Sequence, residues 1–183
     1  MGVHLGSLEN DFILDDSYMT RDNPLMRDLA NIPSFFVAPP PAPVSQNYYR
    51  PGLLASLAID RALGGGSPTT FHLSNILVHG VVTLLVFLLA LRVLGDERAA
   101  LVAALLFGVH PVHGEAVSII NYRAGMLSAM FSLLALLVHS KERRTRASEI
   151  AARLSTAGLS FLAMASKDDG VMIGALLFLH DLA

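Results

Sequence analysis

The chain contains no cysteine, and only 15% of its 183 residues are charged. Without cysteine it has neither disulfides nor thiolate metal sites, although this absence does not identify a compartment. The formal net charge of −2 argues against a nucleic-acid partner, because phosphate backbones are bound by basic surfaces. No basic region followed by an apolar core stands at the N-terminus, so we predict no signal peptide there.

Hydrophobic residues, in contrast, make up 53% of the chain and give it a mean hydropathy of +0.54. Soluble domains usually carry about a quarter of charged residues. The clearest apolar run, from Phe71 to Leu94, is long enough to cross a bilayer as a helix. Its centre, VVTLLVFLLAL, lacks the polar face that helices of soluble bundles usually keep. The sequence therefore predicts an all-α, polytopic membrane protein.

Two regions follow from the spacing of the apolar runs. We expect residues 1–70 to form a lumenal or interfacial loop region, and residues 71–183 to form about five transmembrane or re-entrant helices. Several of the later runs are shorter than the ~20 residues of an ideal span. After the first run they cover residues 99–117, 124–139, 150–166 and 171–183.

The charged breaks between these runs predict an orientation. If the runs cross alternately, GDER (residues 95–98) and KERRTR (residues 141–146) lie on one side, which the positive-inside rule makes cytoplasmic. The region before Phe71 and the breaks HPVHGE (residues 110–115) and SKDDG (residues 166–170) then lie on the opposite side. We therefore expect the unusual polar residues to gather on the non-cytoplasmic face.

The first polar segment is NDFILDDSYMTRDNP, in which Asp15 and Asp16 follow an apolar triplet. Adjacent carboxylates bind a divalent cation or supply a general base. Asp-Asp pairs also occur in ordinary exposed loops and helix caps, so the pair alone leaves both interpretations open.

The second segment, YYRPGLLASLAIDRAL, has Tyr49 and Arg50 just before a proline that favours a helix start. It predicts an amphipathic helix on the membrane surface, with Asp60 and Arg61 toward water. Arg50 is placed to contact a phosphate. The expected apolar stripe consists of Leu53, Leu54, Leu57, Ala58 and Leu63.

The third segment opens the first long run, where His72, Asn75 and His79 share one helical face. Polar packing against a neighbouring helix and direct substrate contact are both open for this stripe.

The fourth segment is LLFGVHPVHGEAVSII, in which Pro111 forbids a regular helix through His110 and its successors. It is not the zinc-protease pattern, which needs two histidines on an unbroken helix. We expect a membrane helix to end here and to direct His110, His113 and Glu115 into a pocket near the outer interface.

Five segments, in this order, resemble the membrane core of the transmembrane and tetratricopeptide-repeat protein O-mannosyltransferases, which belong to the GT-C class. They are FILDDSYMTRDNP, YRPGLLASLAID, FHLSNILVH, LLFGVHPVHGEAVSIINYRAGMLSAMFSLLALL and MASKDDGVMIGALLFLHD. The resemblance runs from about Phe12 to Asp181, and HPVHGEAV is its most specific string. The family has a membrane helix before the Asp-Asp loop and repeats after the core. The chain thus resembles a truncated N-terminal core, and we expect no tetratricopeptide repeats in it.

The resemblance implies a GT-C-like helical core with a lumenal first loop. The implied reaction transfers mannose from dolichyl-phosphate mannose to Ser or Thr hydroxyls of proteins in the secretory pathway. The implied partners are this lipid-linked donor, a protein acceptor and membrane lipid. The implied location is the endoplasmic reticulum membrane, or the plasma membrane of a prokaryote, with multiple spans.

The resemblance also implies roles for residues. Asp15 or Asp16 is the catalytic base. The candidates for binding the donor phosphate or sugar are Arg50, His110, His113, Arg123 and Lys167. The candidates for lining the pocket are Tyr49, His72, Asn75 and Glu115. No cofactor is certain, and a divalent cation stays open. The alternative functions are a non-catalytic membrane scaffold and a transporter fragment with a polar lumenal cavity.

Overall fold

The computed structural model describes residues 2–13, 16–38, 48–141 and 145–182. Every regular element in these ranges is helical, as the sequence predicted. The α-helices are α1 (Asp16–Met19), α2 (Ile32–Phe35), α3 (Pro51–Gly64), α4 (Pro68–Leu94), α5 (Glu97–Val109), α6 (His113–Ser118), α7 (Arg123–His139), α8 (Arg146–Ser166) and α9 (Met172–Leu182). Short 3-10 turns cover Gly2–Glu9, Pro24–Arg27, Leu29–Asn31, Ile120–Tyr122 and Asp168–Val171.

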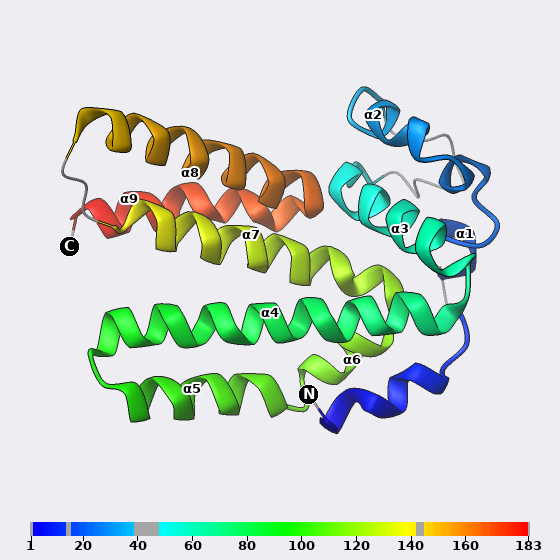
Figure 1. The fold of residues 1–183 in the computed structure, drawn as a ribbon, viewed down its shortest axis with the longest axis horizontal. Helices are drawn as coiled ribbons and strands as arrows, with labels where there is room; N and C mark the ends of the chain where they lie inside the picture. Colours follow the sequence, from blue (N-terminus) through cyan, green and yellow to red (C-terminus); the bar gives the residue numbers. More distant parts are fainter. Residues whose placement is uncertain (1, 14–15, 39–47, 142–144, 183) are drawn as a thin grey trace.

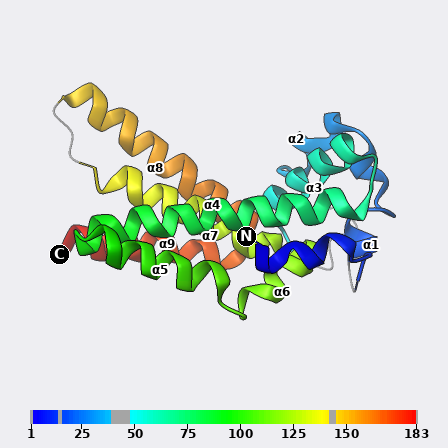
Figure 2. The same ribbon diagram turned by 60° about the horizontal axis from the view of Figure 1, so that its bottom comes forward.

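The helices α4, α5, α7, α8 and α9 run side by side and alternate in direction along the chain (Figure 1). At one end, called here the basic end, α4 and α7 finish and α5 and α8 begin, so the described basic residues Arg92, Arg98, Lys141 and Arg146 stand at or next to helix ends on the same side of the row. At the other end, the first-loop end, α1, α2 and α3 lie beside the start of α4 and the end of α8. Figure 2 shows α8 leaning away from the other four toward the basic end. The basic end and the first-loop end thus lie at opposite ends of the helical row, and the side of a membrane that each end faces stays a prediction.

The helix limits follow local signals in the sequence. Pro68 stands in the first turn of α4, where its missing N–H costs nothing. Gly95 ends α4 in a left-handed conformation, with φ of 66°, which glycine adopts without strain. The next residue, Asp96, caps α5 by accepting a hydrogen bond from the Ala99 N–H at 2.7 Å. α5 ends before Pro111, as predicted, so the histidine string leaves the helix.

Two helical stretches among the described residues are long and apolar enough to cross a membrane. They are Pro68–Leu94 and Ile120–His139, judged by length and composition. α5 and α9 have 13 and 11 residues and are shorter than a full span. The arrangement of about five crossings remains a prediction.

The main hydrophobic core attaches the first loop to the helical row. Leu53, Leu54 and Leu57 of α3 are fully buried with Phe71 at the start of α4. Phe35 of α2 is buried in the same cluster. The apolar stripe predicted for α3 therefore exists. It was expected to lie on lipid, but it packs on protein.

The α3 prediction differs from the structure at three residues. Leu63, placed on the apolar stripe, is 79% exposed, because the cluster that buries α3 does not extend to its last turn. Asp60, expected to face water, is buried, since it pairs with Arg123 from α7. Arg61 also turns back to protein and donates to the Thr20 carbonyl at 2.8 Å.

Candidate functional site

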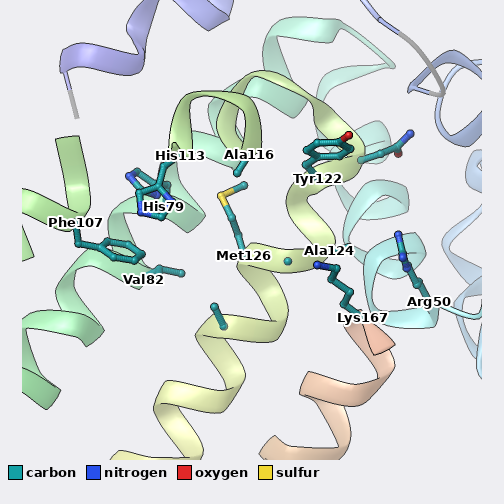
Figure 3. A pocket seen from close by; sticks show the side chains of 13 residues that line it. Arg50, His79, Val82, Phe107, His113, Ala116, Tyr122, Ala124, Met126 and Lys167 are labelled. Carbon is teal, nitrogen blue, oxygen red and sulfur yellow. The ribbon is translucent and has the colours of Figure 1, made fainter. Parts of the chain in front are cut away.

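A cavity of about 490 Å³ opens at the first-loop end, between α4, α6, α7 and the end of α8. Apolar side chains form part of its wall: Val82, Phe107, Ala116, Ala124, Met126 and Ala129. Its polar lining residues are Arg50, His79, His113, Asn121, Tyr122 and Lys167. Figure 3 shows the two histidines and Phe107 on one side of Met126, with Tyr122, Lys167 and Arg50 on the other. The cavity suits a ligand that is partly apolar and partly anionic.

The two cations reach the cavity from segments far apart in sequence. Arg50 directly precedes α3, and Lys167 directly follows α8. The two helices meet closely, because a Cβ added to Gly52 would lie 2.7 Å from the Ser166 Oγ. Glycine at this position lets the start of α3 approach the end of α8. This approach places two positive charges in the lining of the same cavity.

Each cation already has an acidic neighbour from the SKDDG break. The Lys167 Nζ is 2.7 Å from a carboxylate oxygen of Asp169, and the Arg50 Nη2 is 3.7 Å from one of Asp168. The side chains of Asp168 and Asp169 are 68% and 56% exposed. Exposed ion pairs of this kind contribute only about 0–1 kcal/mol. An anionic ligand would therefore displace them at little cost.

Arg50 is also oriented by an aromatic ring. Its guanidinium lies 4.4 Å from the ring centroid of Tyr48, a cation–π contact. Its Nε is buried and has no hydrogen-bond partner among the described residues. A donor that is held in place and unsatisfied favours an incoming acceptor such as a phosphate oxygen.

The opposite wall carries a pair of histidines. The ring centroids of His79 and His113 are 5.4 Å apart, and the His79 Nε2 is 3.1 Å from the Gly108 carbonyl oxygen. Burial, and then the neighbouring His79 and other histidine rings, lower the pKa of His113 below its ordinary value. His113 is therefore neutral at physiological pH and offers a hydrogen bond to a ligand, not a charge.

Three of the residues expected at the pocket, His110, Glu115 and Tyr49, do not line this cavity. His110 is exposed, and its Nδ1 accepts the Val112 N–H at 3.2 Å, which fixes the turn after α5. Glu115 is exposed on α6. Tyr49 donates its hydroxyl to the Phe36 carbonyl at 2.8 Å and so fastens the chain before α3 to α2.

Arg123, expected to bind the donor, is 1% exposed at the start of α7 and does not line the cavity. Its Nη1 is 2.5 Å from an Asp60 carboxylate oxygen. Its Nη2 donates to the Phe71 carbonyl at 2.7 Å, and its Nε donates to the Asn75 side-chain oxygen at 2.6 Å. A guanidinium engaged on three sides by protein joins α3, α4 and α7.

The polar residues of the α4 stripe have different surroundings: some pack against other helices, and one also lines the cavity. Asn75 donates to the carbonyls of Val117 and Ile119 at 3.2 and 3.1 Å, so it packs α4 against the corner before α7. His72 is fully buried and also lies outside the cavity lining. His79 both packs and lines the cavity. Of the two interpretations left open for this stripe, interhelical packing thus holds for Asn75.

The Asp-Asp pair is described at its second residue only, since Asp15 lies outside the described residues. Asp16 begins α1 and is fully buried. Its carboxylate accepts N–H groups of Asn121 at 3.0 Å, Ile120 at 3.3 Å and Ile13 at 3.4 Å. Burial raises the pKa of Asp16, while these three hydrogen bonds act in the opposite direction. Because Asn121 lines the cavity, Asp16 anchors the first loop to the cavity wall.

His79, Asn121 and Tyr122 line the cavity although they were not predicted as lining residues from the sequence. Asn121 and Tyr122 directly precede Arg123, at the junction between two apolar runs. Their polar character at that junction was the available signal. His79 was noted as part of a helical stripe, but the stripe alone did not indicate which of its members would face a cavity.

Comparisons with known proteins give a consistent relationship. No family model matches the chain, and no solved structure gives a significant match. Among curated proteins, mouse protein O-mannosyl-transferase TMTC3 is 35% identical over 131 residues, which is 72% of this chain and 14% of that protein. Human protein O-mannosyl-transferase TMTC2 is 33% identical over 153 residues, 80% of this chain and 18% of that protein.

Drosophila melanogaster protein O-mannosyl-transferase Tmtc1 is 31% identical over 176 residues, which is 92% of this chain and 20% of that protein. The chain spans only 14% to 20% of the length of these three relatives. The match nevertheless covers most of this chain in each comparison. By sequence, the chain belongs to the TMTC family of protein O-mannosyl-transferases.

Proposed function

We propose that the chain is the donor-binding membrane core of a glycosyltransferase. Its reaction is the transfer of mannose from dolichyl-phosphate mannose to Ser or Thr hydroxyls of proteins in the secretory pathway. The names of the relatives support a mannosyl transfer to protein. The observation that carries the proposal is the convergence of Arg50 and Lys167 on a cavity with a largely apolar wall.

The cavity fits the two halves of a lipid-linked sugar phosphate. Arg50 and Lys167 supply the charge that a phosphate needs, and the charge on this phosphate grows as the sugar leaves. His113, neutral and beside the apolar wall, donates a hydrogen bond to the sugar or phosphate. The isoprenoid chain lies along Val82 and Met126 and continues into the bilayer.

The two aspartates of the first loop have different roles, one structural and one catalytic. The Asp16 carboxylate accepts hydrogen bonds from backbone N–H groups, and the bond from Asn121 holds the first loop in place. Its neighbour Asp15 is then the general base. The acceptor hydroxyl oxygen bonds to the anomeric carbon, and the bond from that carbon to the phosphate oxygen breaks. The hydroxyl proton passes to the Asp15 carboxylate, and the electron pair leaves with dolichyl phosphate.

Arg123 supports this site from within the protein. It ties α3 to α4 and α7 through Asp60, Phe71 and Asn75. The same network holds the later part of α3, the helix that Arg50 precedes, at the start of α7. Arg123 is therefore a positioning residue and not a ligand to the donor.

The site is on the lumenal side of a multi-pass endoplasmic reticulum membrane protein. Two apolar helices support membrane insertion. The basic breaks at the opposite end of the helical row support this orientation (Figure 1). A transporter interpretation would need the polar stripe of α4 to line a path, whereas Asn75 and His72 are buried in protein.

Binding of dolichyl-phosphate mannose to the purified protein tests this proposal. Arg50→Gln and Lys167→Gln should each weaken binding by at least ~10-fold, since a hydrogen bond to a charged group contributes about 1.5–3 kcal/mol. Arg153→Gln, an exposed cation on α8 outside the cavity lining, is the matched control and should bind the donor normally. Donor affinities of both cavity variants equal to that of the wild type would refute the phosphate site.

A further inference from the structure

A second cluster of ligand-type side chains lies at the basic end. The last residue of α7, His139, meets His180 and Asp181 from the last turn of α9. One ligand atom from each of the three lies within 4.8 Å of the other two. The His139 Nε2 is 2.6 Å from an Asp181 carboxylate oxygen, and the His180 Nδ1 is 3.5 Å from the same oxygen. Three potential metal ligands thus converge from two helices.

The three side chains are of the types that bind zinc, and the distances between their ligand atoms are close to those of a zinc site. Zn²⁺ takes imidazole nitrogens and carboxylate oxygens at about 2.0–2.2 Å, so tetrahedral ligand atoms lie roughly 3.4 Å apart. The His180–Asp181 separation of 3.5 Å already matches this value. The 2.6 Å contact of His139 with Asp181 has to open by less than about 1 Å to admit the ion. We propose that His139, His180 and Asp181 bind one Zn²⁺ ion, with water as the remaining ligand.

The surroundings permit an ion to enter. The side chains of His139, His180 and Asp181 are 26%, 45% and 60% exposed. A cavity of about 560 Å³ beside His139 and Asp181 is also lined by Glu149 and Arg153. Arg153 is paired with Glu149, so its charge is compensated and does not oppose a cation.

This zinc site is separate from the donor cavity. α7 runs for 17 residues from Arg123 to His139, which corresponds to about 24 Å at 1.5 Å per residue. None of the three ligands lines the donor cavity. The zinc proposal can therefore be tested independently of the proposed transferase function.

The site has a structural consequence for α9. Ile173 is the buried residue of this helix, while Leu176, Phe178 and Leu179 are exposed. Few side chains thus hold its last turns to the rest of the protein. An ion shared by His139 and the end of α9 would link α9 to α7, and binding to the folded state alone raises stability.

Zinc titration calorimetry on the full chain tests the proposal. The protein is purified in detergent without a polyhistidine tag and treated with a chelator before Zn²⁺ is added. We expect saturable binding of one ion per chain and a rise in Tm. Co²⁺ in place of Zn²⁺ should give the visible absorption of a tetrahedral site with nitrogen and oxygen ligands.

Variants separate a zinc site from a simple His–Asp pair. His139→Ala and Asp181→Asn should each weaken Zn²⁺ binding by at least ~10-fold, the lower end of what even outer-shell changes cost metal sites. Asp181→Asn retains the size of the side chain, so it tests the ligand without a packing defect. His110→Ala, an exposed histidine at the other end, should bind Zn²⁺ normally. Absence of saturable binding, or equal binding by all variants, would overturn the proposal.

Discussion

Asp60→Asn tests the buried network that the structure places behind the cavity. Asp60 and Arg123 have side chains that are 7% and 2% exposed, and their charged groups approach to 2.5 Å. Asparagine keeps the shape of the side chain, and its amide oxygen can still accept the hydroxyl of Ser74, now 2.7 Å from the carboxylate. The substitution therefore removes mainly the charge that compensates the Arg123 guanidinium.

The expected loss of stability is large. Removing one partner of a buried ion pair leaves the other charge uncompensated and costs about 3–5 kcal/mol. This is a substantial part of the 5–15 kcal/mol that typically separates folded from unfolded states. Replacing both residues by apolar ones, Asp60→Leu with Arg123→Met, removes the uncompensated charge but leaves the Phe71 carbonyl and the Asn75 side-chain oxygen without this donor, so it should recover only part of the loss.

Denaturant unfolding of the purified protein in detergent measures this effect. Asp22→Asn is the matched control, because the Arg21–Asp22 pair is exposed and should contribute no more than about 1 kcal/mol. If Asp60→Asn unfolds with the same free energy as the wild type and the control, Arg123 is not held as described. In that case Arg123 would again be a candidate for binding the donor.

Three further expectations concern packing, pH and orientation. A Cβ on Gly170 would lie 2.4 Å from the Ala163 carbonyl, so Gly170→Ala should lower Tm through overpacking worth about 1–3 kcal/mol; an unchanged Tm would contradict this contact. Burial raises the pKa of Asp16 in the folded protein above the ordinary aspartate pKa of about 3.9. The stability that this shift contributes is therefore fully present below about pH 3.9 and is lost as the pH rises through the raised pKa. Thermal unfolding of Asp16→Asn should lack this dependence, and an unchanged pH profile would refute it. Engineered N-glycosylation sites should be modified near Ser45 and not near Thr145, and the reverse pattern would overturn the orientation.

The sequence predicted the elements well because their limits depend on local chemistry. Proline, glycine and capping residues set the ends of α4 and α5, and these act within a few residues. The separation of basic and polar breaks followed from counting the apolar runs. Arg50, His113 and Lys167, which all flank apolar segments on the same predicted side, line one cavity in the structure, and their role in binding a donor stays a prediction.

The errors arose where burial depends on a distant partner. Asp60 looked like a water-facing residue because its partner, Arg123, stands more than sixty positions later. Arg123 in turn looked free to bind a ligand. The cluster of His139 with His180 and Asp181 was missed for the same reason, because the C-terminal ends of α7 and α9 meet only through the parallel course of these two helices, which are separated in sequence by α8. No local pattern reports such a pairing.

Mannosyl transfer by Asp15→Asn is the most direct test of the proposed function. The protein is purified from membranes, and transfer from dolichyl-phosphate mannose to an acceptor peptide is measured together with donor binding on the same samples. Loss of the base should lower transfer at least ~100-fold, the lower scale of general-base catalysis, while donor binding stays unchanged. Asp11→Asn, an exposed carboxylate of the same loop, should transfer normally. Transfer by Asp15→Asn at the wild-type rate would contradict the account.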